Sequence, residues 1–425
     1  MSLINRQKIA DGVYFNSVKD SRFKTMRITA NLIVPLSAQT ASANTLLLGV
    51  LSRSCRQYPD FTALSKKLSS LYGAELTVNS GKTGDRHVLS ISAAGIDDRY
   101  AFGGESVARE LSQLLCGVIF EPNISGGAFL SEEVEQERRQ LFDLIDSEFN
   151  EKRIYASNQL IKYMCGNEVF GTPRYGTVES INEVTPESLY KTWQELLRTA
   201  NVEIMYVGDS SPEKAIEVFT ETFSSISRSP AEITNEIVRS AEREQSIVEE
   251  MELAQSTVVM GFRGGIAVPD AQTNAARLMC AVLGGTAQSK LFCNVREKQS
   301  LCYYCASRYD TQKGIMLVYS GVEGKNIEKA KAAILKEIED MKKGEISDFE
   351  VESTKLALIN AFRSSNDTVS GIESWYTSQL FNGEFKSIDE MSDEMSRVTK
   401  AEIIAAAQKL SLDTVYILKN KEEVK

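Results

Sequence analysis

The chain has 425 residues, which is enough for roughly two to four domains with large hydrophobic cores. Its formal net charge of −10 argues against nucleic acid or an anionic membrane surface as the main partner, because both attract clustered Lys and Arg. No apolar run approaches the roughly 20 residues of a membrane helix, and the stretch from Met1 to Lys8 lacks the apolar core of a signal peptide. We therefore expect a cytoplasmic protein that has no membrane partner.

Strands and helices alternate in the first half of the chain. Asp60 can cap a helix whose apolar stripe includes Leu64 and Leu68, and Thr185 precedes a proline at the first position of another helix. Strands are predicted at residues 14–18, 25–35, 76–78, 87–92 and 202–209. Helices are predicted at 45–51, 60–73, 99–120, 131–164 with room for a break, 186–198 and before residue 223.

The second half repeats this order after a polar segment. Residues 229–246 are charged and aperiodic, so we predict a linker there between a domain at 1–228 and a domain at 247–425. Strands follow at 247–261, 300–309, 315–320 and 413–418, and helices at 274–283, 291–298, 326–343, 348–381 and from Thr399. The same order at a spacing a little over 200 residues predicts two homologous domains of α+β class, each an antiparallel sheet packed with helices.

Seven cysteines are scattered along the chain, which suits a reducing compartment better than a disulfide framework. The spacing of Cys302 and Cys305 is that of a metal or redox motif. These two residues lie in a predicted strand, where residues three apart face opposite sides. We therefore expect the sulfurs to diverge and to have no metal or redox role.

One helix-to-strand corner is more distinctive than the rest. Leu291, Phe292 and Val295 share one face of a short helix, and Arg296 and Tyr303 flank the corner that follows. In isolation this pattern fits a solvated Arg and a half-buried strand Tyr.

The sequence of that corner, Leu-Phe-x-x-Val-Arg-Glu-Lys-x-x-Leu-x-Tyr, resembles a signature in the C-terminal domain of the pitrilysin/insulinase superfamily. These peptidases carry an inverted His-x-x-Glu-His zinc motif. The resemblance implies a half clamshell like that of the mitochondrial processing peptidase. It also implies that Arg296 and Tyr303 bind the substrate backbone near the scissile carbonyl and support the transition state. The glycine-rich loop of that peptidase's non-zinc subunit is reduced here to Gly284 and Gly285.

The zinc site of the superfamily cannot be built from this chain. The family motif needs two His and a Glu on one helix and a later Glu, whereas His87 is the only histidine in the sequence. Thr45, Leu48 and Gly49 stand at the degenerate motif positions, and Leu144 stands at the position of the later Glu. We therefore predict no metal site and no cofactor in this chain, and zinc only in a partner.

Two further expectations concern polar residues near this region. His87 begins a predicted strand, so a packed or surface histidine is expected. The acidic residues that open the helix at Ser131 are expected to form a solvated first turn; they are Glu132, Glu133, Glu135 and Glu137.

The leading hypothesis is a zinc-less subunit of a cytoplasmic heterodimeric peptidase that is inactive alone. Its partners would be a zinc-bearing homologous subunit and an unfolded peptide, and a homodimer is expected if the chain is isolated. A non-catalytic structural or interaction module of the same fold is the alternative. A third interpretation is an independent metallopeptidase with other ligands, which zinc bound to the purified chain would support.

Overall fold

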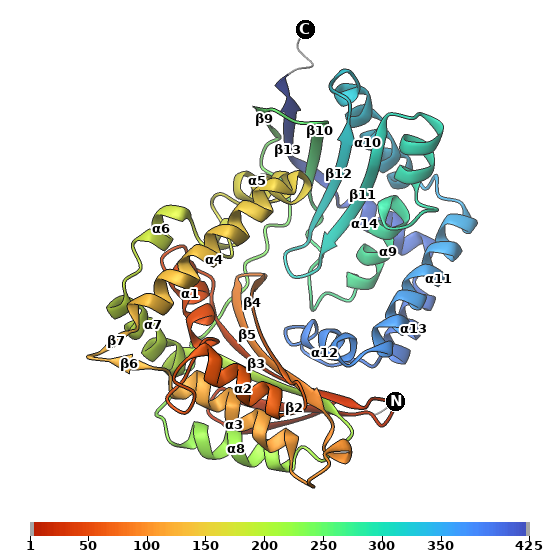
Figure 1. Ribbon diagram of the computed structural model, residues 1–425. Helices are drawn as coiled ribbons and strands as arrows, with labels where there is room; N and C mark the ends of the chain where they lie inside the picture. Colours follow the sequence, from red (N-terminus) through yellow and green to blue (C-terminus); the bar gives the residue numbers. More distant parts are fainter. Residues whose placement is uncertain (1–3, 422–425) are drawn as a thin grey trace. The chain divides into compact units, whose positions relative to one another are not determined.

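The computed structural model describes residues 4–421, so the outermost residues of the predicted N-terminal stretch and of the two predicted domains lie outside the described part. Two compact units are formed (Figure 1). Unit 1 comprises the described residues of Met1–Ile145, Thr172–Thr234 and Ser365–Leu380, and unit 2 those of Asp146–Gly171, Asn235–Ser364 and Phe381–Lys425. Each unit therefore contains one segment from the other half of the sequence.

Unit 1 is organised around a six-stranded sheet in the order β1-β2-β8-β3-β5-β4. The strands are β1 (Asn5–Ala10), β2 (Val13–Lys19), β8 (Asn201–Gly208), β3 (Thr25–Pro35), β5 (Arg86–Ile96) and β4 (Glu75–Thr83). Strands β2 and β8 pair in parallel and the other neighbours are antiparallel. The first strand, β1, was not predicted. A short hairpin, β6 (Ile124–Ser125) with β7 (Ala128–Phe129), stands apart from this sheet.

Unit 2 repeats this arrangement in a five-stranded sheet of order β11-β12-β10-β13-β9. The strands are β11 (Cys302–Asp310), β12 (Ile315–Val322), β10 (Ser256–Arg263), β13 (Ser411–Asn420) and β9 (Gln245–Met251). Strands β9 and β13 pair in parallel, as β2 and β8 do in unit 1. The two sheets match strand for strand once β1 is set aside, which confirms the predicted α+β class with two homologous domains.

Most helices occupy the predicted regions with several boundary changes, whereas α6 and α13 were not predicted. Unit 1 holds α1 (Ala41–Leu51), α2 (Phe61–Ser70), α3 (Val107–Phe120), α6 (Val178–Asn182), α7 (Pro186–Thr199), α8 (Glu213–Ser224) and α12 (Val369–Thr377), and α4 (Ser131–Asn150) runs from unit 1 into unit 2. Unit 2 holds α5 (Lys152–Met164), α9 (Thr273–Gly284), η3 (Leu291–Lys298), α10 (Ile327–Lys342), α11 (Asp348–Ser364), α13 (Ile388–Arg397) and α14 (Lys400–Gln408). Short 3₁₀ turns lie at Asp98–Tyr100, Val169–Gly171, Gly324–Asn326 and Ser365–Asp367.

Capping side chains fix several of these helix starts. The Asp60 carboxylate accepts a hydrogen bond of 2.8 Å from the backbone N–H of Ala63, so α2 begins where the sequence predicts. Thr185 and Thr399 form capping boxes at the starts of α7 and α14. Helix α3 begins only after Ser106, later than the predicted start at residue 99, because Ser106 caps it.

One helix in each unit comes from the opposite half of the chain. Helix α5 packs on β10 and β13 of unit 2, and α12 packs on β3 and β8, the equivalent strands of unit 1 (Figure 1). The predicted helix at 348–381 is therefore wrong as a continuous helix, since the turn Ser365–Asp367 separates α11 from α12. The possible break in the predicted helix at 131–164 is confirmed, since α4 ends at Asn150 and α5 begins at Lys152.

A buried network of ion pairs holds the segment Asp146–Gly171, which unit 2 takes from the first half of the chain. The Arg263 guanidinium lies 2.6 Å from the Glu168 carboxylate and 2.9 Å from the Asp413 carboxylate. Lys313, which is fully buried, reaches the same Glu168 carboxylate at 3.4 Å. Arg263 also donates a hydrogen bond of 2.8 Å to the Met164 carbonyl at the end of α5. Removing one partner of such a network would leave a buried charge uncompensated.

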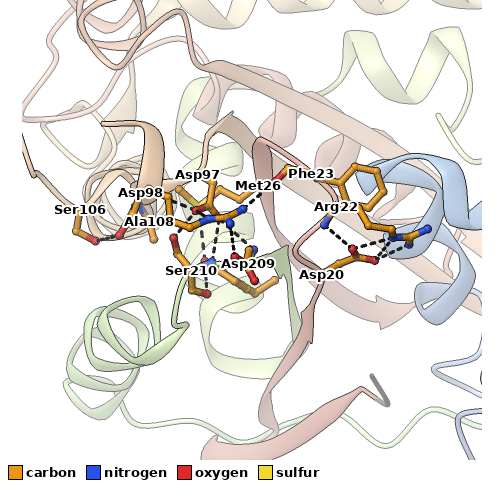
Figure 2. A network of polar contacts seen from close by, with 12 residues as sticks. Asp20, Arg22, Phe23, Met26, Asp97, Asp98, Ser106, Ala108, Asp209 and Ser210 are labelled. Atoms are coloured by element: carbon orange, nitrogen blue, oxygen red, sulfur yellow. Dashed lines mark hydrogen bonds and ion pairs between the residues drawn. The ribbon is translucent and has the colours of Figure 1, made fainter. Parts of the chain in front are cut away.

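A second buried carboxylate joins two strand ends of unit 1 (Figure 2). Asp97 follows β5 and accepts hydrogen bonds from the backbone N–H groups of Asp209 at 3.0 Å and Ser210 at 2.8 Å. The Ser210 hydroxyl and Arg99 donate to the same carboxylate. Burial alone would raise the pKa of Asp97, but the donors, led by Ser210, lower it below its usual value.

Candidate functional site

The candidate site is built on the corner between η3 and β11 in unit 2. Leu291 and Val295 are buried, and η3 is hydrogen-bonded in the wide π pattern, which is rare and often lies near functional sites. The Leu301 N–H donates a hydrogen bond of 3.2 Å back to the Val295 carbonyl. Between them Ser300 has a φ of +50°, a left-handed conformation that a residue with a Cβ seldom adopts. The chain therefore turns sharply before β11 begins.

Unit 1 contains the same corner between α2 and β4. There the Ala74 N–H donates a hydrogen bond of 3.0 Å to the Leu68 carbonyl. This bond spans the same number of residues as the bond from Leu301 to Val295. Gly73, which precedes Ala74 as Ser300 precedes Leu301, has a φ of +74°. The repeated backbone geometry supports descent of the two units from one ancestral domain.

Arg296 is oriented by its own corner. Its Nε donates a hydrogen bond of 2.9 Å to the Tyr303 carbonyl, so the planar guanidinium is fixed against the first residues of β11. Its guanidinium carbon lies 4.6 Å from the centre of the Phe292 ring, and Nη1 lies 3.4 Å from the Glu297 carboxylate. The side chain is 38% exposed. A guanidinium has five N–H donors, and the corner carbonyl uses only one of them.

Tyr303 stands out from the strand beside Arg296. The register of β11 with β12 shifts between Cys302 and Tyr304, so Tyr303 is the extra residue of a β-bulge. Its side chain is 57% exposed, and its hydroxyl lies 3.4 Å from the Glu323 carboxylate, a long and weak hydrogen bond. Lys325, followed by smaller effects that include the Tyr303 hydroxyl, lowers the pKa of Glu323.

Arg296 and Tyr303 border one open hollow. The structure therefore brings the two predicted site residues together. The residues lining the hollow are Arg296, Glu297, Ser300, Leu301, Cys302, Tyr303, Glu323 and Asn326. The hollow offers a guanidinium held at its Nε, an exposed hydroxyl donor and two carboxylates, and the two donors suit the binding of peptide carbonyl oxygens.

The prediction that the two sulfurs diverge is wrong. Cys302 pairs with Val322 and Cys305 pairs with Ser320, and these two partners lie two residues apart on β12. Residues two apart on a strand share a face, and paired residues lie on the same side of the sheet. The bulge at Tyr303 inserts one residue and so brings Cys302 and Cys305 onto one face. Sequence spacing alone could not reveal the bulge, because it depends on the pairing with β12.

The degenerate zinc positions lie on α1 and α4 of unit 1. Thr45 is buried, and its hydroxyl is hydrogen-bonded to the Ser80 hydroxyl at 2.9 Å and to the Arg174 carbonyl at 3.1 Å. Leu48 is buried in the hydrophobic core. A Cβ at Gly49 would collide with a carboxylate oxygen of Glu137, which fills the adjacent space.

Leu144, at the position of the later glutamate, is 51% exposed on α4. The structure thus joins none of the degenerate positions into a ligand set. Within residues 4–421, no group of three or more His, Cys, Asp or Glu side chains is arranged to hold a metal ion.

The expectation of a solvated first turn in α4 is wrong for two of its four acids. Glu137 forms an ion pair of 2.7 Å with Arg53, and its side chain is largely buried. Glu133 accepts a hydrogen bond of 2.7 Å from the Ser54 hydroxyl, and burial raises its pKa. The Arg53 guanidinium therefore neutralises the carboxylate beside the degenerate motif.

His87 lies in β5 and is fully buried, which confirms the packed alternative. Its Nε2 lies 2.8 Å from the Ser80 hydroxyl, and Ser80 in turn contacts Thr45. Its Nδ1 has no hydrogen-bond partner among the residues that the structure describes. Burial lowers the pKa of His87 to about 4, so the imidazole is neutral at pH 7.

The fold and the site define a peptidase-like protein whose zinc-motif positions carry no metal ligands. A model of the "Peptidase M16 inactive domain" matches residues 183–358, which include the Arg296–Tyr303 corner. The chain is 30% identical over 423 residues to a Bacillus subtilis protein described as "Probable inactive metalloprotease YmfF", covering 99% of both chains. The chain therefore belongs to the M16 peptidase family, which confirms the resemblance carried by the corner signature.

Solved structures share the whole fold. A conserved protein from Enterococcus faecalis V583 superimposes with a TM-score of 0.91 at 28% identity, covering 100% of both chains. A peptidase M16 inactive domain from Pseudomonas fluorescens superimposes with a TM-score of 0.79 at 18% identity, covering 98% of both chains. Within residues 4–421, no helix is long and apolar enough to cross a membrane.

Proposed function

We propose that the chain is the zinc-less subunit of a cytoplasmic two-subunit zinc peptidase. A zinc-bearing homologue supplies the hydrolytic centre, and this chain supplies Arg296 and Tyr303. The observation that carries the proposal is a contrast between the two units. The corner of unit 2 presents both donors on one hollow, whereas Thr45, Leu48 and Gly49 of unit 1 offer no metal ligands.

Arg296 grips a carbonyl oxygen of an unfolded peptide. Its Nε stays on the Tyr303 carbonyl, which fixes the plane of the guanidinium before the substrate arrives. A pre-oriented donor loses little conformational freedom on binding, so it aligns the peptide at small entropic cost.

Tyr303 acts on the oxygen that becomes negative as water adds to the scissile carbonyl. Its hydroxyl exchanges the weak contact with Glu323 for a stronger hydrogen bond to that oxygen. A donor placed in this way typically lowers the barrier by about 3 kcal/mol. Neither residue activates water, so the chain alone has no nucleophile.

The experiment mixes the purified chain with a zinc-bearing M16 homologue from the same organism. Size-exclusion chromatography reports the complex, and cleavage of an unfolded peptide reports activity. The proposal predicts a heterodimer that cleaves only when both chains are present, with zinc bound to the partner alone. Stoichiometric zinc in this chain would overturn the proposal. A stable complex that cleaves nothing would favour the alternative, a structural module of the same fold.

A further inference from the structure

Two thiols converge at the edge of the candidate site. Because Cys302 lies opposite Val322 and Cys305 lies opposite Ser320, the cysteines are separated by two steps of β12 rather than three. Two strand steps correspond to roughly 6.4–6.8 Å between Cα atoms. Disulfides usually join Cα atoms roughly 4.4–6.8 Å apart, so this separation lies at the upper edge of the range that a disulfide spans.

The two thiols differ in access. Cys302 is half-buried and lines the hollow, where a small oxidant can reach it. Cys305 is buried behind it, among the core residues of unit 2. The geometry therefore provides one accessible sulfur and one sheltered sulfur on the same face of the sheet.

The pKa values of the two thiols also differ, and the accessible Cys302 has the lower one. The Cys305 thiol donates to Cys302 and lowers its pKa to about 7, with smaller contributions from the Ser320 hydroxyl and the Arg296 charge, against the effect of burial. The same interaction, followed by burial, raises the pKa of Cys305. Burial also raises the pKa of four other cysteines: Cys55, Cys116, Cys165 and Cys280. Among these six cysteines, the thiolate, which is the reactive form, is thus concentrated at Cys302.

We propose that Cys302 and Cys305 are a redox-active thiol pair that a hydroperoxide converts into an intrachain disulfide. In the first step the Cys302 thiolate attacks an oxygen of the hydroperoxide and the O–O bond breaks. Cys302 becomes a sulfenic acid, and the other oxygen leaves as water or an alcohol after taking up a proton.

In the second step the Cys305 sulfur attacks the Cys302 sulfur. The S–S bond forms, the S–O bond breaks, and the hydroxide leaves as water with the proton of Cys305. The two sulfurs together lose two electrons, and the hydroperoxide gains them.

Disulfide formation has a consequence for the candidate site, and this consequence rests on the proposed function. Tyr303 is the bulged residue between the two cysteines, so drawing the sulfurs together contracts the strand around it. The Tyr303 carbonyl, which orients Arg296, moves with the bulge. A disulfide that must deform the backbone is also readily reduced, which is the property of a reversible regulatory bond.

Tryptic mapping tests the pair directly. Cleavage after Lys298 and Arg308 releases residues 299–308, which contain Cys302 and Cys305 and no other cysteine. After treatment of the intact chain with hydrogen peroxide and alkylation, we expect this peptide to lose two hydrogens in mass and to resist alkylation until it is reduced. We expect this change before oxidation of the four buried cysteines. Recovery of both residues in alkylated form, or oxidation beyond the sulfenic state at Cys302 without a disulfide, would overturn the proposal.

Single variants assign the two roles. In Cys305→Ser the sulfenic acid at Cys302 has no resolving thiol, so dimedone should trap it. In Cys302→Ser the remaining Cys305 should stay reduced at the same peroxide dose. Equal oxidation of Cys305 in the presence and absence of Cys302 would contradict the assignment. Circular dichroism of both variants checks that they fold.

The paired peptidase assay then separates this inference from the proposed function. We expect peroxide to abolish cleavage by the complex and a dithiol reductant to restore it, whereas the complex with Cys305→Ser should not form the bond. If the disulfide forms and cleavage persists, the redox pair stands and its effect on the Arg296–Tyr303 site falls. If the disulfide does not form, the redox pair falls and the proposed function is unaffected.

Discussion

The buried His87 of unit 1 makes the stability of the protein depend on pH, and replacing this one residue measures its contribution. His87 is the only histidine in the chain, and burial lowers its pKa from 6.5 to about 4. Between these two pH values the unfolded chain binds a proton that the folded chain does not. Stability therefore falls as the pH falls from about 6.5 towards 4.

The size of this effect follows from the two pKa values. The wild-type chain should lose about 2 kcal/mol of unfolding free energy through His87 between pH 7 and pH 5, and about 3 kcal/mol once the pH is below both values. In His87→Gln the amide can still hydrogen-bond the Ser80 hydroxyl but does not titrate. The pH-dependent loss should therefore be about 2 kcal/mol smaller in the variant, whatever its stability at pH 7.

Two assays measure this prediction. Urea unfolding of both proteins at pH 7 and pH 5 gives the difference in free energy. Because the chain has one imidazole, NMR of selectively ¹³C-histidine-labelled protein gives one titrating signal. Its midpoint should lie near pH 4 in the folded protein. A midpoint above about 6, or equal acid losses in wild type and His87→Gln, would refute the reasoning.

Three further substitutions test other features of the fold. Glu168→Gln leaves Arg263 and Lys313 buried without their shared carboxylate and should cost unit 2 about 3–5 kcal/mol in denaturant unfolding, whereas Glu195→Gln, in an exposed ion pair, should cost under about 1 kcal/mol. Asp97→Asn should lower the stability of unit 1 by about 1–3 kcal/mol at pH 7, and by less as the pH falls towards the lowered pKa of Asp97, because protonation then weakens the same contacts in the wild type. Ser300→Gly should keep or raise the melting temperature, since glycine adopts a positive φ without strain, and a lower melting temperature would show that the Ser300 side chain matters more than its backbone.

Much of the fold could be predicted from local signals. The capping residues Asp60, Thr185 and Thr399 mark helix starts that the structure reproduces, because a cap depends on a few adjacent residues. The repeated order of elements also predicted two domains of one class, which the matching strand orders confirm.

The features that sequence reasoning missed depend on contacts between distant segments. The placement of α5 and α12 on sheets of the other half is set by packing that no local pattern reports. The bulge at Tyr303 arises from the pairing of β11 with β12, and it reversed the expected faces of Cys302 and Cys305. Likewise, Glu137 was predicted to be solvated because its ion-pair partner, Arg53, lies far away in the sequence.

The candidate site was proposed from the sequence for a different reason. The prediction that the chain holds no zinc needed only a count of histidines, and the Arg296–Tyr303 pair lies within a short stretch of eight residues. The hydrogen bond from Arg296 to the Tyr303 carbonyl was not predicted, because it requires the left-handed turn at Ser300.

The most direct test of the central claim is the turnover number of the paired complex. Arg296→Ala and Tyr303→Phe are compared with Lys298→Ala and Tyr304→Phe, neighbouring residues that do not line the hollow. We expect kcat to fall about 100-fold in Tyr303→Phe, in line with a donor worth about 3 kcal/mol, kcat/KM to fall in Arg296→Ala through poorer peptide alignment, and little change for either control. Full activity in both site variants, or peptide cleavage by this chain alone after treatment with a chelator, would contradict it.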